Sequence, residues 1–161
     1  MINDIKKIQW KTLLISIAIP LIIGLISFLL SGDVASQYGA MEKPTLSPPA
    51  SVFPIVWTML YILMGISSYL VVASECDSEN KESAVSIYSA QLFFNFFWTI
   101  LFFKFQLYFF SFLWLMVLWI LIVITIMKFY KCVPPAGYLL IPYLVWVTFA
   151  AYLNLATALL N

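Results

Sequence analysis

Charged residues in this sequence fall into short clusters, and five long stretches between them carry no charge at all. These stretches cover about residues 12–30, 52–73, 84–103, 107–127 and 137–160. Each approaches the roughly 20 residues that a helix needs to cross about 30 Å of hydrocarbon. Because 64% of the residues are apolar and only 9% are charged, the chain lacks the polar groups that a water-exposed surface needs. The pattern predicts an integral, multi-pass membrane protein.

The spans are expected to be helices, because they are longer than barrel strands and show no alternation of apolar and polar residues. The predicted fold class is an all-α membrane protein, a bundle of five transmembrane helices that forms a single domain over residues 1–161. A proline-rich loop with Pro44, Pro48 and Pro49 joins the first two helices. Pro20 and Pro142 are expected to kink the first and fifth helices. The first span is too long for a typical cleavable signal peptide.

Lysine placement predicts the orientation, because positive residues are retained on the cytoplasmic side. Five spans put six lysines on one side (Lys6, Lys7, Lys11, Lys81, Lys128 and Lys131) and two on the other (Lys43 and Lys104). We therefore expect a cytoplasmic N-terminus, with the proline-rich loop facing outward, in the plasma membrane of a prokaryote. The net charge of +1 gives no reason to expect a nucleic-acid partner.

Several kinds of chemistry lack their usual residues. The chain has no histidine, so Cys76 and Cys132 make neither a zinc site nor a thiol–histidine pair, and a histidine-ligated haem is excluded. We expect these cysteines to be free thiols and the protein to hold no metal or cofactor. No acid or lysine lies in the middle of a span, which argues against a proton-coupled pump.

Uncharged polar residues mark one face of the third span. Gln91, Asn95, Trp98 and Phe102 follow one another at helical spacing. Two unpaired amides in hydrocarbon would cost several kcal/mol each, so this face should point into the bundle. Two interpretations remain open for the amides: hydrogen bonds between helices, or direct contact with a ligand.

Aromatic residues mark a second face, in the span after the proline-rich loop. Trp57, Tyr61, Met64 and Ser68 share helical spacing there. Such a face suits a flat heteroaromatic or sterol-like ligand. The other tryptophans divide into Trp10, expected at the membrane interface, and Trp114 and Trp119, expected to pack against lipid or other helices without polar company.

Four blocks of residues make the chain similar to a known family. They are Tyr38 with Lys43-Pro44 and Pro48-Pro49; Val56-Trp57 with Leu60-Tyr61 and Met64-Gly65; Gln91, Asn95, Trp98 and Phe102-Phe103; and Pro142-Tyr143-Leu144, Trp146, Phe149-Ala150 and Leu153-Asn154. Their order and spacing resemble the TspO/MBR family, the tryptophan-rich sensory proteins that include the mitochondrial translocator protein, or peripheral benzodiazepine receptor.

The resemblance implies a five-helix protein, often a homodimer, that binds porphyrins of the protoporphyrin IX type and other hydrophobic heterocycles beneath the first loop. By matching position, the pocket would be lined by Tyr38, Trp57, Asn95, Trp98, Trp146 and Ala150; Tyr61 and Gln91 join this set from their helix faces. The porphyrin would be a ligand rather than a cofactor. The small residues Gly65, Ser67 and Ser68 allow close packing, either between two copies or inside one bundle.

The resemblance leaves three functional classes. A receptor or carrier for tetrapyrroles is the first. The second is light- and oxygen-dependent degradation of porphyrin, with Trp57 and Trp146 as candidate redox-active neighbours, so whether the protein is an enzyme stays open. Transport of a tetrapyrrole or lipid is a weaker third, because the spans hold no coupling residue and no obvious inverted repeat.

The chain departs from the family pattern in the first loop. Gln37 and Leu46 stand where tryptophans are usual. The prolines restrict this loop, so we expect it to cover the pocket as a lid, by shape more than by stacking. Lys43 and Lys104 would either meet porphyrin carboxylates or anchor helix ends by snorkelling. No basic residue follows Lys131, so a cholesterol motif after the fifth span is not supported.

Overall fold

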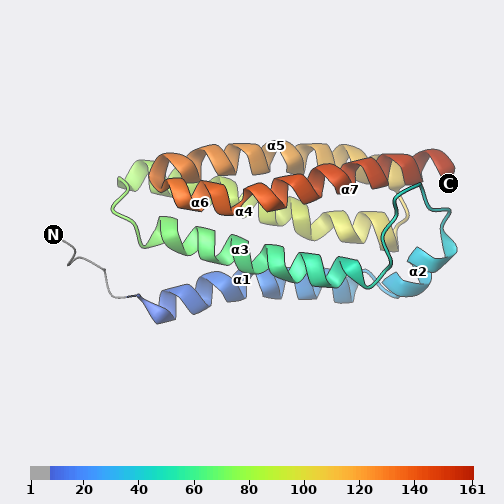
Figure 1. The fold of residues 1–161 in the computed structure, drawn as a ribbon, viewed down its shortest axis with the longest axis horizontal. Helices are drawn as coiled ribbons and strands as arrows, with labels where there is room; N and C mark the ends of the chain where they lie inside the picture. The colour runs from blue at the N-terminus through green and yellow to red at the C-terminus, as the bar shows by residue number, and fades with distance from the viewer. Residues whose placement is uncertain (1–7) are drawn as a thin grey trace.

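The protein is a bundle of five membrane-spanning helices. A computed structural model describes residues 8–161. The five helices are α1 (Trp10–Leu30), α3 (Val52–Val72), α4 (Ser78–Thr99) with the π-helix η1 (Ile100–Lys104), α5 (Tyr108–Cys132), and α6 (Pro134–Leu139) with α7 (Ile141–Leu160). These helices lie side by side along the long axis (Figure 1). Every regular element within the described range is helical, which confirms the predicted five-helix bundle.

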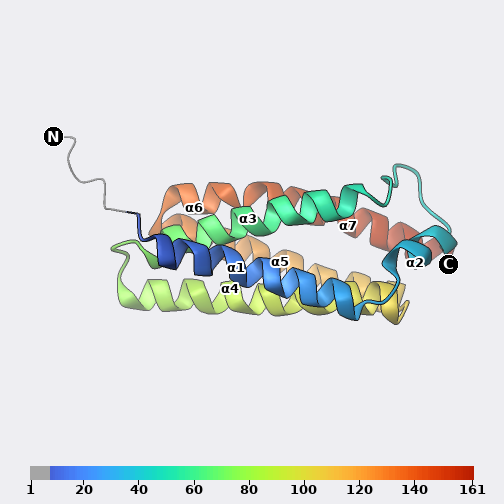
Figure 2. The same cartoon turned by 90° about the horizontal axis from the view of Figure 1, so that it is seen from below.

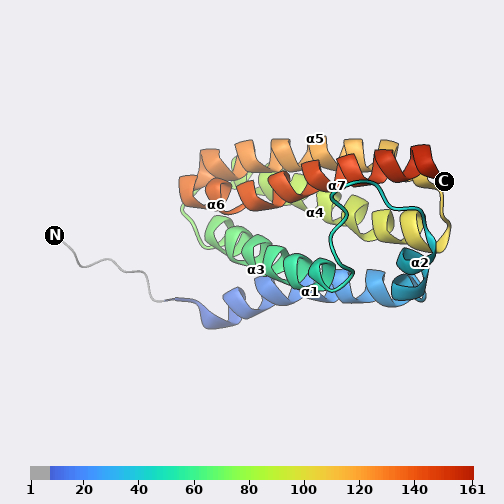
Figure 3. The ribbon, with the colours of Figure 1, turned by 45° about the vertical axis from the view of Figure 1, so that its right-hand side comes forward.

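The two ends of the bundle differ. At one end lie α2 (Val34–Ala40), the proline-rich loop of residues 41–51 and the C-terminus, on the right in Figures 1 and 2. We call this the lid end and the loop the lid. The lid runs past α7, to which it is hydrogen-bonded (Figure 3). At the other end lie the α3–α4 turn and the α5–α6 junction, which we call the disulfide end.

Local capping sets where two helices begin. The chain leaves α1 through Gly32, whose φ of +82° suits glycine. Asp33 then caps α2 by accepting a hydrogen bond from the Ser36 amide at 3.1 Å. Asp77 caps α4 in the same way, from the Asn80 amide at 2.9 Å. The side-chain and backbone hydrogen bonds from Asn80 also lower the pKa of the Asp77 carboxyl.

The helix boundaries differ from the uncharged stretches in two places. Residues 78–83 of the acidic connector expected over residues 74–83 are helical, because the Asp77 cap starts α4 at Ser78. Helix α5 also continues beyond Met127, where the fourth uncharged stretch ends, to Cys132. Hydropathy marks the part of a helix that meets lipid, whereas hydrogen bonding decides where the helix ends.

The predicted proline kinks have different outcomes. The fifth span is broken at Leu140, between α6 and α7, two residues before Pro142. A break there agrees with the missing amide hydrogen of proline. Helix α1, in contrast, is continuous through the buried Pro20.

Contacts inside the bundle explain one group of small residues on α3. A Cβ atom at Gly65 would lie 2.4 Å from the Ile17 Cα atom, so this contact requires glycine. Ser67 donates a hydrogen bond to the Ala136 carbonyl at 2.7 Å, and Ser68 donates to the Gly65 carbonyl at 3.0 Å. These residues therefore serve packing inside one bundle, which was the second of the two predicted alternatives.

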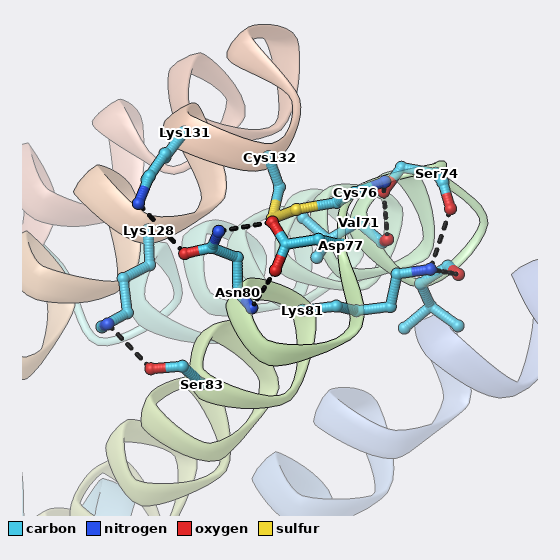
Figure 4. Close-up of a disulfide and its surroundings, with 11 residues drawn as sticks. Val71, Ser74, Cys76, Asp77, Asn80, Lys81, Ser83, Lys128, Lys131 and Cys132 are labelled. Carbon is cyan, nitrogen blue, oxygen red and sulfur yellow. Dashed lines mark hydrogen bonds between the residues drawn. A yellow bond between two sulfur atoms is a disulfide. The ribbon is translucent and has the colours of Figure 1, made fainter.

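The cysteines form a disulfide, so the prediction of free thiols is wrong. Cys76 and Cys132 are separated by 56 positions in sequence, yet their Cα atoms lie 5.2 Å apart (Figure 4). The α3–α4 turn meets the last turn of α5, because α4 packs along α5. The five predicted spans place both cysteines near loops on the same side, but the packing of the helices decides that these two loops meet.

Lysine side chains surround the disulfide. Lys81 donates to the Val72 and Ser74 backbone carbonyls, Lys128 to the Ser83 hydroxyl and Lys131 to the Oδ1 atom of the Asn80 side chain (Figure 4). Lys11 lies at this end as well, whereas Lys43 and Lys104 lie at the lid end. This grouping of lysines is as predicted, although Lys6 and Lys7 lie outside the described residues. Which end faces the cytoplasm remains a prediction.

Candidate ligand-binding site

A buried polar network links three helices at the centre of the bundle. The Tyr61 hydroxyl donates to the Asn95 Oδ1 atom at 2.8 Å, and Asn95 Nδ2 donates to the Tyr143 hydroxyl at 2.9 Å. Tyr143 in turn donates to Gln91 Oε1 at 2.8 Å. The remaining Gln91 amide group contacts the Met64 sulfur at 3.7 Å. Gln91 and Asn95 are each 1% exposed, and these bonds satisfy both amides, so hydrogen bonding between helices is their observed role.

Sequence reasoning missed the role of Tyr143. This side chain both accepts and donates in the network, and it joins α7 to α4. A signal was available, because Tyr143, Val147, Ala150 and Asn154 share helical spacing and all are buried.

A second polar cluster lies nearer the lid. The Trp98 indole N–H donates to Asn154 Oδ1 at 2.9 Å, and Asn154 Nδ2 donates to the Tyr108 carbonyl at 2.7 Å. Ser111 donates to the same Asn154 oxygen at 3.2 Å. Because its N–H is already bonded, Trp98 offers a ligand the face of its ring rather than a hydrogen-bond donor.

Trp57 stands at the centre of an aromatic cluster above the first network. Its ring centroid lies 5.6 Å from that of Tyr61, 6.1 Å from that of Trp98 and 6.2 Å from that of Tyr143. Trp98 also stacks on Phe102 at 5.7 Å. These distances are typical of interacting aromatic pairs. The structure thus brings the two predicted faces, on α3 and α4, together.

A small cavity lies beneath the lid. Its walls are Tyr38, Met41, Lys43, Pro44, Ser47 and Phe53 on the lid side, and Trp98, Phe102, Phe103, Ala150, Leu153, Asn154 and Thr157 below. Its volume is about 30 Å³. Sites for small molecules measure about 300–1,000 Å³, so the site is closed in this structure. Of the predicted site residues, Tyr38, Trp98 and Ala150 line the cavity.

The other predicted residues lie around the cavity rather than in its wall. Tyr61, Gln91 and Asn95 belong to the polar network. The Trp57 ring packs against Tyr61 of that network. Trp146 lies to the side, with its ring 6.1 Å from Phe53 and 5.6 Å from Phe149. A ligand large enough to reach the whole predicted set would have to displace side chains that now fill the centre. The assignment of these residues to ligand contact remains a prediction.

Hydrogen bonds to α7 hold the lid closed. Tyr152 donates to the Thr45 carbonyl at 2.9 Å. Asn161 donates to the Glu42 carbonyl at 3.1 Å and accepts from the Glu42 amide at 3.0 Å. Within this end, Tyr38 donates to the Pro48 carbonyl at 2.6 Å, and its partial burial raises the pKa of the hydroxyl, which keeps it protonated.

The two departures from the family pattern have different surroundings. Leu46 is 78% exposed at the tip of the lid, with a φ of +70°. Gln37 is half-buried, and its buried Oε1 atom has no hydrogen-bond partner within residues 8–161. Neither side chain lines the cavity. The lid therefore covers the cavity without an aromatic ring at either position.

Both lysines of the lid end are exposed, but only Lys43 lines the cavity. Its ammonium group lies 5.2 Å from the centre of the Tyr38 ring and donates to the Gly39 carbonyl at 3.4 Å. Lys104 ends η1 at the same end of the bundle. Pairing of these lysines with porphyrin carboxylates remains a prediction.

Trp114 and Trp119 pack between helices, as one of the predicted alternatives had it. Their expected lack of polar partners is wrong. Trp114 donates to the Phe94 carbonyl and stacks on the Phe94 ring, and Trp119 donates to the Thr148 hydroxyl, each hydrogen bond being 2.8 Å long. These partners lie on neighbouring helices and leave no local pattern in the sequence.

A larger apolar groove lies on the membrane-facing side, between α3 and α7. Its volume is about 540 Å³. It is lined by Val56, Met59, Leu60, Leu63, Ile141, Pro142, Val145, Trp146 and Phe149. The indole N–H of Trp146 is buried and pairs with no group in the described part of the chain. Trp146 therefore contributes to this groove, and its ring adjoins Phe53 in the wall of the cavity.

Comparisons with known proteins show the family of this chain. The sequence profile of the TspO/MBR family matches residues 16–160. The tryptophan-rich protein TspO of Chlorobaculum tepidum is 35% identical over 154 residues, which cover 95% of this chain and 98% of the relative. The tryptophan-rich sensory protein of Cereibacter sphaeroides is 36% identical over 124 residues, 77% of this chain and 76% of the relative. The translocator protein of Ovis aries is 35% identical over 125 residues, 76% of this chain and 73% of the relative. The chain is an integral membrane protein that belongs to the TspO/MBR family.

Proposed function

We propose that the protein is a membrane receptor or carrier that binds porphyrins and other flat hydrophobic heterocycles beneath the lid. The observation that carries the proposal is the aromatic cluster of Trp57, Trp98 and Tyr143, enclosed under a lid inside a membrane-spanning bundle. The names of the relatives, sensory protein and translocator protein, support a role in reception or transport. Transport itself is the weaker alternative, because the described spans hold no charged coupling residue at their centres.

The chemistry of the site favours recognition by stacking. The amides of Gln91 and Asn95 already have partners, and the Trp98 N–H is bonded to Asn154. A ligand would therefore gain mainly from aromatic contact and burial of its apolar surface. Charged groups on a porphyrin would have to remain at the lid end, where Lys43 lines the cavity.

Binding requires the closed cavity to widen. If the lid lifts, three hydrogen bonds break, one to Tyr152 of α7 and two to Asn161, the residue that follows α7. At about 0.5–1.5 kcal/mol net for each bond, lifting costs roughly 1.5–4.5 kcal/mol. The open form is then a minor population, and the apparent affinity falls by that fraction. A tight ligand must offset this cost by its contacts with the aromatic cluster.

The test is a titration of the purified protein with protoporphyrin IX, followed by the porphyrin absorption band. Trp57→Phe keeps a ring but loses indole area, and stacking is worth about 0.5–1.5 kcal/mol, so the Kd should rise about two- to tenfold. Trp10→Phe, at the exposed start of α1, serves as the control and should leave the Kd unchanged. Absence of saturable binding by the wild type would refute the proposal, and equal Kd values for the two variants would remove Trp57 from the site.

A second candidate function is light- and oxygen-dependent degradation of the bound porphyrin. It is favoured by the place of Trp57, whose indole contacts three rings of the cluster and would be the nearest indole, with Trp98, to a ligand there. Illumination in air with protoporphyrin should bleach the pigment faster with wild type than with Trp57→Phe or Trp146→Phe. Bleaching no faster than in detergent alone would reject the enzymatic function and leave binding intact.

The oligomeric state belongs to the same proposal. A homodimer is expected from the family resemblance. Gly65 and Ser67 are committed to contacts inside the bundle, so a dimer would use another surface. Light scattering of the purified protein in detergent, corrected for bound detergent, measures this state directly.

A further inference from the structure

The seam between α3 and α7 is a weak line in the bundle. Helix α3 packs mainly against α1 and α6, whereas α7 packs mainly against α5. Between α3 and α7 the apolar groove of about 540 Å³ opens toward the membrane. Met59 and Val145, which line it, are 59% and 63% exposed on membrane-spanning helices. Lipid tails and molecules dissolved among them therefore have direct access to this groove.

Two aromatic side chains separate the groove from the cavity under the lid. Phe53 lines the cavity, and Trp146 lines the groove. Their rings form an edge-to-face pair with centroids 6.1 Å apart, and the Phe53 ring also contacts Tyr38 at 5.3 Å. On α7, Phe149 faces the groove and the adjacent Ala150 faces the cavity. Rotation of the Phe53 and Trp146 side chains would thus join the two spaces without unfolding a helix.

The opposite route, past the lid, is closed by polar contacts. Tyr152 and Asn161 bond the lid to α7, and Tyr38 bonds to the Pro48 carbonyl. A ligand that came from water would have to break these bonds. A hydrophobic heterocycle, however, is concentrated in the hydrocarbon, because burial of apolar surface favours its transfer out of water.

Trp146 adds a chemical feature to the groove. Its buried indole N–H has no partner among residues 8–161, although buried polar groups are usually paired. Because this N–H is covered, a molecule that only rests in the groove does not reach it. Once the Trp146 side chain rotates, an acceptor atom such as a carbonyl oxygen or ring nitrogen would satisfy the donor, whereas a saturated hydrocarbon chain would not. The unpaired donor therefore favours passage of a heterocycle with an uncharged acceptor over that of a bare acyl chain.

We infer that the groove between α3 and α7 is a lateral portal through which flat hydrophobic heterocycles pass from the bilayer into the cavity, with Phe53 and Trp146 as its gate. This inference rests on the proposed binding function and adds the route that the ligand takes.

The test plugs the groove and measures the rate of binding separately from affinity. Protoporphyrin IX is loaded into lipid vesicles, which are mixed with protein in nanodiscs, and the time course of binding is recorded. Val145→Trp fills the groove at a membrane-exposed position and should lower the association rate about tenfold, because the gate must open against added bulk. The equilibrium Kd should stay within about twofold of wild type. Val117→Trp, on the exposed face of α5, is the matched control and should leave both values unchanged.

A second variant separates the portal from the lid route. Tyr152→Phe removes one bond between lid and α7. Passage through the portal predicts an unchanged association rate, whereas passage beneath the lid predicts a faster one. Binding by wild type with equal rates for Val145→Trp and Val117→Trp would overturn the portal and leave the proposed function standing. Loss of a dimer in Val145→Trp, with its association rate unaltered, would instead show a contact between copies and also overturn the portal. No binding by wild type would refute the proposed function itself.

Discussion

Removal of one hydroxyl group tests whether the polar network holds the three helices together. Tyr143→Phe deletes a hydroxyl that accepts from Asn95 and donates to Gln91. The substitution keeps the ring, so its contact with Trp57 remains. It leaves one buried donor and one buried acceptor without a partner. The effect on stability should therefore exceed that of losing any single bond in the network.

Two limits give the size of this effect. Hydrogen bonds between membrane helices average about 0.6 kcal/mol, so the loss of two costs about 1.2 kcal/mol. If the two amide groups stay unpaired, each costs about 1–3 kcal/mol, so that the upper limit is about 6 kcal/mol. Tyr61→Phe breaks one bond, to Asn95, and should cost about half as much as Tyr143→Phe. The unfolding free energy of the three proteins can be compared by denaturation in mixed micelles of mild detergent and SDS.

Tyr88→Phe provides the control. The Tyr88 hydroxyl is buried but has no hydrogen-bond partner within the described chain. Its removal should be neutral or slightly stabilising, since no bond is lost and a buried polar group disappears. The expected order of destabilisation is Tyr143→Phe, then Tyr61→Phe, then Tyr88→Phe. If Tyr143→Phe costs no more than Tyr88→Phe, the network does not stabilise the bundle.

Two further predictions concern packing and the disulfide. Gly65→Ala should destabilise the protein by about 1–3 kcal/mol, because its Cβ atom would meet the α1 backbone, whereas Gly39→Ala, with no heavy atom within 4 Å of its added Cβ, should be neutral in the same denaturation assay. A maleimide reagent should not label Cys76 or Cys132 in protein purified without reductant, but it should label both after reduction. Mass spectrometry of the peptides measures this labelling. Labelling without reductant would contradict the disulfide.

Local patterns in the sequence predicted the helices and two of their inward faces. Trp57 on α3 does meet Trp98 on α4, Tyr61 meets Asn95 and Met64 meets Gln91, because helical spacing fixes which residues share a face. Spacing does not say which face of another helix lies opposite. The partnership of Asn95 with Tyr143 therefore could not be predicted, although the burial of Asn95 could.

The residues of the candidate site could also be predicted only in part. Tyr38, Trp98 and Ala150 line the cavity as expected, but Trp146 lines the groove instead. Its position depends on how closely α3 approaches α7, which no single span encodes. The break at Leu140 also contributes, because it sets the direction in which α7 leaves α6. Residue type indicated an aromatic site, and helix packing decided which aromatic side chains line the cavity and which line the groove.

The disulfide and the lysines around it carry different information about orientation. Lysine bias acts during membrane insertion and predicts that this end lies in the cytoplasm. A disulfide persists in an oxidising compartment and is rare in the cytosol of mesophiles. The two signals point to opposite compartments wherever the disulfide is formed, so the question is whether the fold of this end depends on it. Other bonds hold the same elements: Lys131 joins α5 to Asn80 of α4, and Ser67 joins α3 to Ala136 of α6. The end can therefore keep its arrangement with reduced thiols, and the lysine bias remains the stronger guide to orientation.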